Sequence, residues 1–257
     1  MLKRLFIVFP LLIILGHVAT SAESSLYSEL INLAEIEFQV VEHASSNIHY
    51  IWLHGDEKTA RLLLNEHIKT QPGKAFLINN EEREVKVGGL LLDPNRMFSR
   101  NGAKSNLQKM NANLSDSELN QTLDLLDKER DRFFDIVKPP PGGLLIALHN
   151  NIRNYSIKDE LANSDEVSLK NSEHPPHHHF FICTDENDFK ILSKSPYNVV
   201  LQKSQAIDDG TLSRLAASKG IRYINIETRL GYLSVQRKML QYVMENLRVH
   251  KLPATNQ

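Results

Sequence analysis

The chain has 257 residues, 30 basic and 31 acidic side chains, and a formal net charge of -1 at pH 7. This balance, without a basic stripe or interleaved aromatic and basic residues, argues against nucleic acid as a partner. The only cysteine, Cys183, cannot form an internal disulfide, so the fold must depend on a hydrophobic core. The length suits one large α/β domain or two small ones.

The first segment has the order of a secretory signal peptide. Lys3 and Arg4 precede an apolar run over residues 5–15, and small residues follow at positions 20–22. The apolar run is well short of the ~20 residues that span a bilayer, so an uncleaved anchor is the less favoured alternative. We predict a signal peptide over residues 1–22, one domain over residues 23–257, and a periplasmic or secreted protein without a stable membrane anchor.

Apolar runs of strand length recur through the rest of the chain. Several are continuous Val, Ile and Leu stretches, which are typical of strands covered on both faces in a mostly parallel sheet. The predicted strands cover residues 48–53, 75–78, 85–92, 144–148, 180–184, 199–202 and 221–226.

Amphipathic stretches of helix length alternate with these strands. The predicted helices cover residues 57–69, 117–137, 188–192, 212–218 and 233–248, and we expect long loops over residues 99–115 and 154–179. This alternation predicts an α/β fold, a three-layer α/β/α sandwich with a mixed, mostly parallel sheet.

Three side chains with metal-binding chemistry stand at the ends of predicted strands. His54 and Glu57 form a His-x-x-Glu pair after the first strand, and His149 follows the strand over residues 144–148. The carboxyl ends of parallel strands meet at one edge of a sheet, where ligands bind in α/β folds. Two imidazoles and one carboxylate leave one position of a tetrahedral zinc ion for water, whose pKa falls to ~7 in favourable sites.

A carboxylate ends a later strand. Glu227 follows the run Tyr223 to Ile226. At the same edge of the sheet it can take a proton from water and pass it to a leaving nitrogen. The structural alternative, a solvated glutamate that ends a strand, is equally compatible with the spacing.

Asn95 and Arg96 follow the strand predicted over residues 85–92. The planar guanidinium matches a carboxylate in two-point hydrogen bonding, and the amide supplies a further donor. A turn with a surface arginine is the alternative, but the place beside the predicted metal favours a substrate anchor.

These motifs, in this order, resemble the zinc carboxypeptidase superfamily, and most closely its succinylglutamate desuccinylase/aspartoacylase branch. The resemblance runs from about Asn47 to the last helix and depends on short motifs. It implies that one zinc ion is held by two motif ligands and a later histidine, that an Asn-Arg pair holds a substrate carboxylate, and that a late glutamate is the general base. In this chain the corresponding residues are His54, Glu57, His149, Asn95, Arg96 and Glu227.

The expected function is therefore an exported zinc-dependent hydrolase that cleaves an amide or peptide bond next to a free carboxylate. Export favours a peptide or cell-wall peptide as substrate. The alternatives are an N-acyl amino acid deacylase with the same ligands, and a non-catalytic module that binds zinc or carboxylates.

Some assignments stay open at this stage. A second arginine that polarises the scissile carbonyl, and a hydrogen-bonding phenol, each have three candidates. A metal role for the run His177 to His179 is less favoured than the entry to a strand. The candidates are Arg100, Arg153 and Arg229 for the arginine, and Tyr155, Tyr197 and Tyr232 for the phenol.

Overall fold

The computed structural model describes residues 27–152, 154–170, 177–203 and 207–247. The predicted signal peptide, residues 1–22, lies outside the described residues. Within them, none of the helices has the length and apolar character needed to cross a bilayer.

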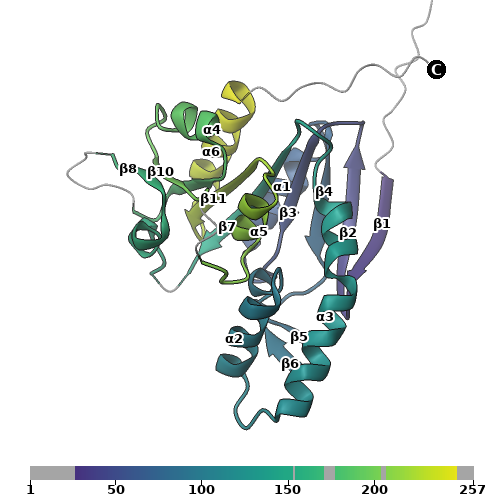
Figure 1. Cartoon of the computed structure of the whole chain (residues 1–257). Coiled ribbons are helices and arrows are strands. Elements are labelled where there is room, and N and C mark those ends of the chain that lie inside the picture. Colours follow the sequence, from purple (N-terminus) through teal and green to yellow (C-terminus); the bar gives the residue numbers. More distant parts are fainter. Residues whose placement is uncertain (1–26, 153, 171–176, 204–206, 248–257) are drawn as a thin grey trace, which may run out of the picture.

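One sheet forms the centre of the molecule (Figure 1). Its strands are β1 (Tyr27–Leu33), β2 (Ile36–His43), β3 (Ile48–Trp52), β4 (Gly73–Ile78), β7 (Leu144–Asn151), β8 (Glu166–Ser168), β9 (Phe180–Cys183), β10 (Asn198–Leu201) and β11 (Tyr223–Arg229). They lie in the order β1-β2-β4-β3-β7-β11-β9-β10-β8. The neighbours β4, β3, β7 and β11 are mutually parallel, whereas β2, β9 and β10 run opposite to the other six strands. The predicted mixed, mostly parallel sheet is confirmed.

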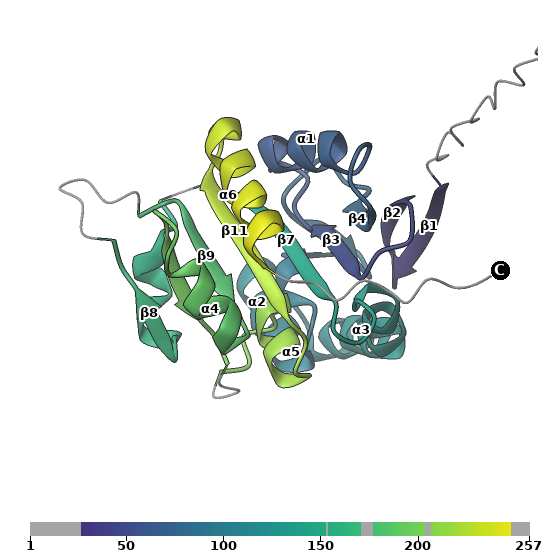
Figure 2. The same ribbon diagram turned by 90° about the horizontal axis from the view of Figure 1, so that it is seen from above.

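Helices cover both faces of this sheet. The α-helices of the described residues are α1 (Lys58–His67), α2 (Arg100–Met110), α3 (Asp116–Val137), α4 (Glu186–Leu192), α5 (Leu212–Ser218) and α6 (Leu233–Asn246). Helices α1 and α6 pack together on one face, and α3 and α5 lie on the other (Figure 2). The three-layer α/β/α sandwich is therefore confirmed.

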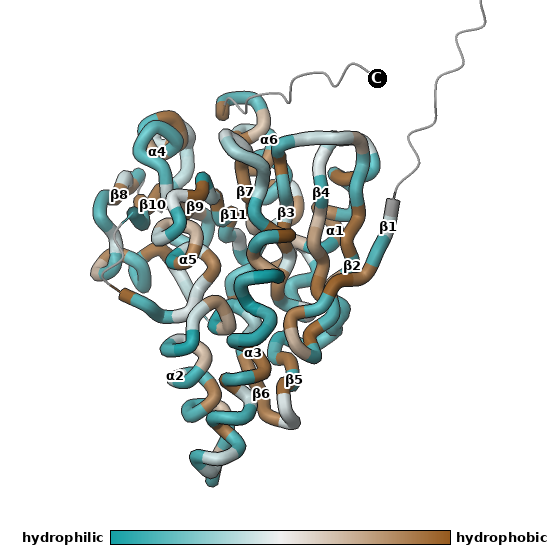
Figure 3. Tube along the Cα trace, turned by 45° about the vertical axis from the view of Figure 1, so that its right-hand side comes forward, coloured by the Kyte–Doolittle hydropathy of each residue, from teal (hydrophilic) through white to brown (hydrophobic). Residues whose placement is uncertain are grey.

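The hydropathy pattern accounts for this arrangement. All eight residues of β7 are buried, as expected for a strand between two helical layers. Helix α3 buries one stripe, with Leu119, Leu123, Leu126 and Phe133 inside, and turns hydrophilic residues outward (Figure 3). Its amino end is stabilised by a capping box between Ser115 and the third helical residue.

Two predicted segments need correction. The single strand predicted over residues 85–92 is a hairpin of β5 (Val85–Val87) and β6 (Leu90–Leu92), because Gly88 and Gly89 adopt positive φ angles of 57° and 78° and reverse the chain. The loop predicted over residues 99–115 contains α2, which packs on α3 and β6. Together these elements form an extension below the sheet (Figure 1).

Other elements were missed in the sequence. The antiparallel pair β1 and β2 alternates buried and less buried residues along β2, a pattern that indicates a half-buried strand. The loop predicted over residues 154–179 contains the short edge strand β8 and two 3-10 turns, η2 (Ile157–Asp159) and η3 (Leu161–Asn163).

Candidate active site

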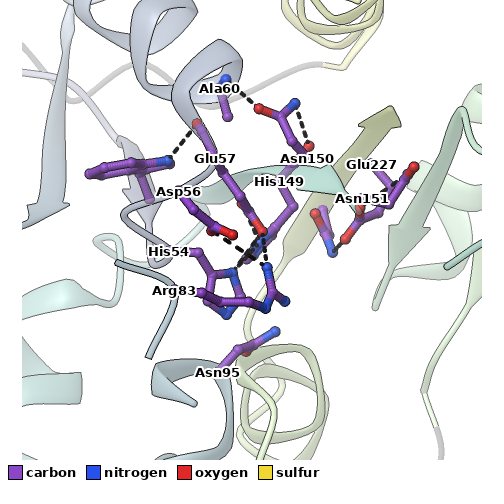
Figure 4. A network of polar contacts seen from close by, with 12 residues as sticks. His54, Asp56, Glu57, Ala60, Arg83, Asn95, His149, Asn150, Asn151 and Glu227 are labelled. Carbon is purple, nitrogen blue, oxygen red and sulfur yellow. Dashed lines mark hydrogen bonds and ion pairs between the residues drawn. The ribbon is translucent and has the colours of Figure 1, made fainter. Parts of the chain in front are cut away.

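The residues singled out in the sequence meet at the carboxyl edge of the parallel strands, where a cavity of about 210 Å³ opens. Figure 4 shows the metal-binding candidates close together, with Asn95 from the 3-10 turn η1 (Pro94–Arg96) on one side and Glu227 from β11 on the other. All six predicted site residues line this cavity: His54, Glu57, Asn95, Arg96, His149 and Glu227.

A tight turn after β3 brings Glu57 back toward His54. The Glu57 amide donates to the His54 carbonyl at 3.1 Å, and Trp52 Nε1 donates to the Glu57 carbonyl at 3.1 Å. The turn requires glycine at position 55, because a Cβ there would lie 2.4 Å from the Asn80 carbonyl oxygen. Close backbone packing at Gly55 thus forms the turn that brings the two residues of the His-x-x-Glu pair together.

The side chains of His54, Glu57 and His149 form one compact buried cluster. Nδ1 of His54 lies 3.2 Å from Nδ1 of His149. One Glu57 carboxylate oxygen lies 2.8 Å from the His54 nitrogen, and the other lies 3.0 Å from the His149 nitrogen. The three residues are exposed by no more than 2%. Among the residues described, they are the one set of three His, Cys, Asp or Glu side chains close enough to share a metal ion.

The donor geometry fits a small divalent metal. Two imidazole nitrogens bound to one tetrahedral zinc ion at about 2.0–2.1 Å would lie about 3.3 Å apart, close to the 3.2 Å found between His54 and His149. Imidazole and carboxylate donors suit zinc and other first-row transition metals better than Ca²⁺ or Mg²⁺.

The electrostatics of the cluster favour a cation between these donors. Burial lowers the pKa of His54, but the Glu57 and Asp93 carboxylates outweigh this effect and raise it to about 9. Burial raises the pKa of Glu57, but His54 and His149 outweigh it and hold that pKa well below its usual range. A divalent cation that binds here replaces the His54 proton, because a metal ligand must be deprotonated.

Asp93 orients His54 for this role. Its carboxylate oxygen Oδ1 lies 2.8 Å from Nε2 of His54. The same oxygen accepts a hydrogen bond from the Asn95 backbone amide at 2.8 Å. A proton on Nε2, held by Asp93, leaves the lone pair on Nδ1 facing Glu57 and His149.

We expect Asp93→Asn to weaken metal binding by about 10- to 100-fold, because loss of an outer-shell carboxylate frees the His54 ring. Competition with a chromophoric chelator measures this change. Asn106→Ala is a suitable control, because Asn106 accepts only the Asp93 amide at 2.9 Å and makes no described contact with His54. Equal metal affinity in Asp93→Asn and wild type would contradict the orienting role.

A buried network of amide side chains fixes the strand that carries His149. Asn150 Oδ1 accepts the Ala60 backbone amide at 2.8 Å, and Asn150 Nδ2 donates to the Thr228 hydroxyl and to the side-chain oxygen Oε1 of Gln236, both at 3.2 Å. Gln236 Nε2 donates in turn to the His149 carbonyl at 2.9 Å. These hydrogen bonds therefore connect the sheet to α1 and α6 directly behind the candidate metal ligands.

Glu227 sits beside His149 in the parallel pair of β7 and β11. It is 5% exposed and accepts hydrogen bonds from Asn225 at 3.1 Å and Asn151 at 3.4 Å. Burial raises its pKa, and the nearby Glu57 carboxylate adds to the increase, while His149 opposes it. A raised pKa makes the ionised carboxylate a stronger base, so it takes a proton from water more readily than an ordinary carboxylate does.

Asn95 and Arg96 form the opposite wall. The Leu212 amide donates to Asn95 Oδ1 at 3.0 Å, an arrangement that leaves the Nδ2 donor for other partners. The Arg96 guanidinium is partly exposed and has a loose ion pair with Asp209, with 3.5 Å between Nη1 and Oδ2. Its fork of N–H donors therefore retains capacity for a ligand carboxylate.

The remaining candidates are distributed differently. Arg100 pairs with Asp124 and Asp127 on α3, away from the cavity, and Arg229 is exposed and does not line it. Arg153 lies outside the described residues. Of the three tyrosines, only Tyr155 lines the cavity.

The cavity is also lined by Arg83 and Glu160, which the sequence analysis did not single out. Arg83 Nη1 donates to Glu57 at 3.1 Å. Its sequence neighbours are Glu81, Glu82 and Glu84, so the sequence alone indicates an ordinary charged residue on a solvated loop. Neither residue carries a periodic or spacing signal.

Comparison with known proteins gives matches among solved structures only. No family model matches the chain, and no curated protein matches it. The chain is similar to a succinylglutamate desuccinylase/aspartoacylase from Rhodobacter sphaeroides, with 11% identity, a TM-score of 0.44, and coverage of 91% of this chain and 68% of that one.

Two further structures are similar to a comparable degree. A candidate metallopeptidase from Shewanella amazonensis has 11% identity, a TM-score of 0.43, and coverage of 86% of this chain and 87% of that one. The product-bound ectoine utilization protein EutE from Ruegeria pomeroyi has 11% identity, a TM-score of 0.42, and coverage of 84% and 63%.

Proposed function

We propose that the chain is a zinc-dependent hydrolase that cleaves an amide or peptide bond next to a free carboxylate. The observation that supports this most directly is the convergence of His54, Glu57 and His149, which come from far-separated parts of the sequence. They meet in a cavity that also contains a buried glutamate and an Asn-Arg pair.

In this proposal each wall of the cavity has one task. A zinc ion held by His54, Glu57 and His149 supplies a Lewis acid that lowers the pKa of water and polarises a carbonyl oxygen. Glu227 takes the proton from the attacking water and passes it to the leaving nitrogen. Asn95 and Arg96 bind the substrate carboxylate and so place the bond beside Glu227.

Arg83 is the candidate for a further stabilising role. It lines the cavity and lies within hydrogen-bond distance of Glu57. A guanidinium beside the reacting carbonyl stabilises the negative charge that develops on its oxygen. Arg83 replaces Arg100 and Arg229 in this proposal, because those two do not line the cavity.

An N-acyl amino acid deacylase is the second candidate. The cavity of about 210 Å³ is small beside the range of about 300–1,000 Å³ for drug-sized ligands, which favours a compact substrate. The same residues serve the peptidase and the deacylase reaction. The two substrates differ in the group on the carbonyl side of the scissile bond, which is a peptide in one and a short acyl group in the other.

We also propose that the protein is exported and acts on peptides of the cell wall. The support is the order of basic, apolar and small residues over positions 1–22. N-terminal sequencing of protein recovered from the cell envelope tests export, and a chain that still begins at residue 1 would contradict cleavage.

Metal analysis of purified protein, followed by a substrate panel, tests the function. We expect one zinc per chain and hydrolysis that a chelator abolishes and added zinc restores. Release of the C-terminal residue from peptides supports the peptidase, and release of a short acid from acyl amino acids supports the deacylase. A protein that binds zinc and panel ligands but hydrolyses none of them would indicate the non-catalytic module.

A further inference from the structure

A carboxylate without a cationic partner lines the cavity. Glu160 follows η2 and is partly buried, and its two oxygens accept hydrogen bonds from the Tyr155 hydroxyl and from Gln202 Nε2, the latter at 2.5 Å. Within the described part of the chain, no Lys, Arg or His side chain forms an ion pair with it. Two other carboxylates of the cavity differ in this respect: Glu57 contacts Arg83, and Asp209 faces Arg96. Glu227 also has no ion pair among the described residues, but its proposed role is that of the general base.

Gln202 adds an acceptor next to this carboxylate. It is 2% exposed, and its Oε1 atom has no hydrogen-bond partner among the described residues. An ionised carboxylate can only accept, so the amide nitrogen is the atom that faces Glu160 and the oxygen is left over. A buried acceptor without a donor costs free energy and is normally satisfied.

The two neutral donors hold Glu160 in place without cancelling its charge. Burial and the Glu160 carboxylate raise the pKa of Tyr155 well above its usual range, so the phenol keeps its proton and remains a donor. This wall of the cavity therefore presents a fixed negative charge together with a spare acceptor. Such a surface suits a group that is positively charged and carries several N–H donors.

We propose that Glu160 and Gln202 bind an ammonium or guanidinium group of the substrate. The inference rests on the proposed function, because it identifies the substrate as one with a cationic group in addition to the carboxylate bound by Asn95 and Arg96. Glu160 is then a specificity-determining residue, and a neutral substrate of the same shape leaves its charge unpaired.

Two sources of the cation are compared in the test. A panel of N-acyl and peptide substrates ending in lysine or norleucine examines a side-chain ammonium, and free or acetylated amino termini examine an α-ammonium. We expect kcat/KM to be about 10- to 100-fold higher for the cationic member of one of these pairs, as a charge-assisted hydrogen bond requires. Equal kcat/KM within both pairs would overturn the inference.

Variants of Glu160 separate its charge from its packing. Glu160→Gln is expected to bring the ratio of cationic to neutral substrate close to one, whereas Glu160→Asp, which retains the charge, is expected to keep a clear preference. Asp209→Asn removes another partly exposed carboxylate of the cavity and is expected to retain the ratio. A ratio that Glu160→Gln leaves unchanged would contradict the assignment, and thermal melting shows that each variant is folded.

Binding without turnover distinguishes failure of this inference from failure of the proposed function. Calorimetry with zinc-loaded protein compares lysine, norleucine and N-acetylnorleucine as ligands. Turnover of the panel without discrimination rejects the role of Glu160 and leaves the hydrolase standing. Selective binding of a cationic ligand, lost in Glu160→Gln, without turnover of any substrate supports the role of Glu160 and rejects the hydrolase.

Discussion

His149→Ala is expected to purify without zinc and without measurable hydrolysis. The variant removes one of three ligands from a buried site and leaves the Glu57 carboxylate with one imidazole. Four-ligand zinc sites bind with apparent free energies of about 10–16 kcal/mol, so loss of one ligand should cost roughly 3 kcal/mol or more, about 10²-fold or more in Kd. Metal analysis and competition with a chelator measure the loss.

His49→Ala is the matched control for the loss of a buried imidazole. His49 lies on the neighbouring strand β3, is 7% exposed, and bonds to the Val137 carbonyl at 2.8 Å outside the cavity. This variant should lose stability and keep its zinc. Stoichiometric zinc in folded His149→Ala would show that the three donors do not share an ion.

Glu227→Gln should lower kcat by about 10²- to 10⁴-fold, the usual contribution of a positioned general base. The amide has nearly the same shape but cannot take a proton, so zinc content and substrate binding should change little. The ionised carboxylate is the active form of a base. Activity of the wild type should therefore fall as the pH falls through the Glu227 pKa, which burial raises, and the residual activity of the variant should lack this acidic limb.

Asn225→Ala is a useful companion to this variant. Asn225 donates to Glu227 at 3.1 Å and helps to hold it, but it carries no titratable group. We expect a smaller loss of kcat with the acidic limb retained. A wild-type kcat in Glu227→Gln would exclude Glu227 as the base. An acidic limb that remains in the pH profile of Glu227→Gln would assign that titration to another group.

The convergence of His54, Glu57 and His149 could be predicted because strand ends are visible in the sequence. Apolar runs stop at His54 and near His149, and parallel strands bring their carboxyl ends to one edge. The structure moves His149 from just after its strand to a position inside it, since β7 continues to Asn151. The polar run from His149 to Asn151 hides this continuation, because most hydrogen-bond partners of its side-chain amides lie far away in the sequence.

The extension and the far wall of the cavity could not be predicted in the same way. Helix α2 is rich in polar residues and contains Gly102, so its sequence reads as a loop. It forms because it packs on α3 and β6 and because Ser99 caps it. Glu160 and Arg83 lie on connections between elements, and only the tertiary fold aims them into the cavity.

The close approach of two glycines links the extension to substrate recognition. A Cβ on Gly102 would lie 2.2 Å from the Gly210 Cα atom, and the Gly210 carbonyl accepts the Phe98 amide at 3.1 Å, two residues after Arg96. The turn that carries Arg96, the proposed carboxylate anchor, thus lies against the amino end of α2. The proposed metal donors lie in β7 and in the turn after β3. If these proposed roles are correct, we expect changes in the extension to shift Arg96 and so alter which acid the cavity accepts, without altering the cluster of His54, Glu57 and His149.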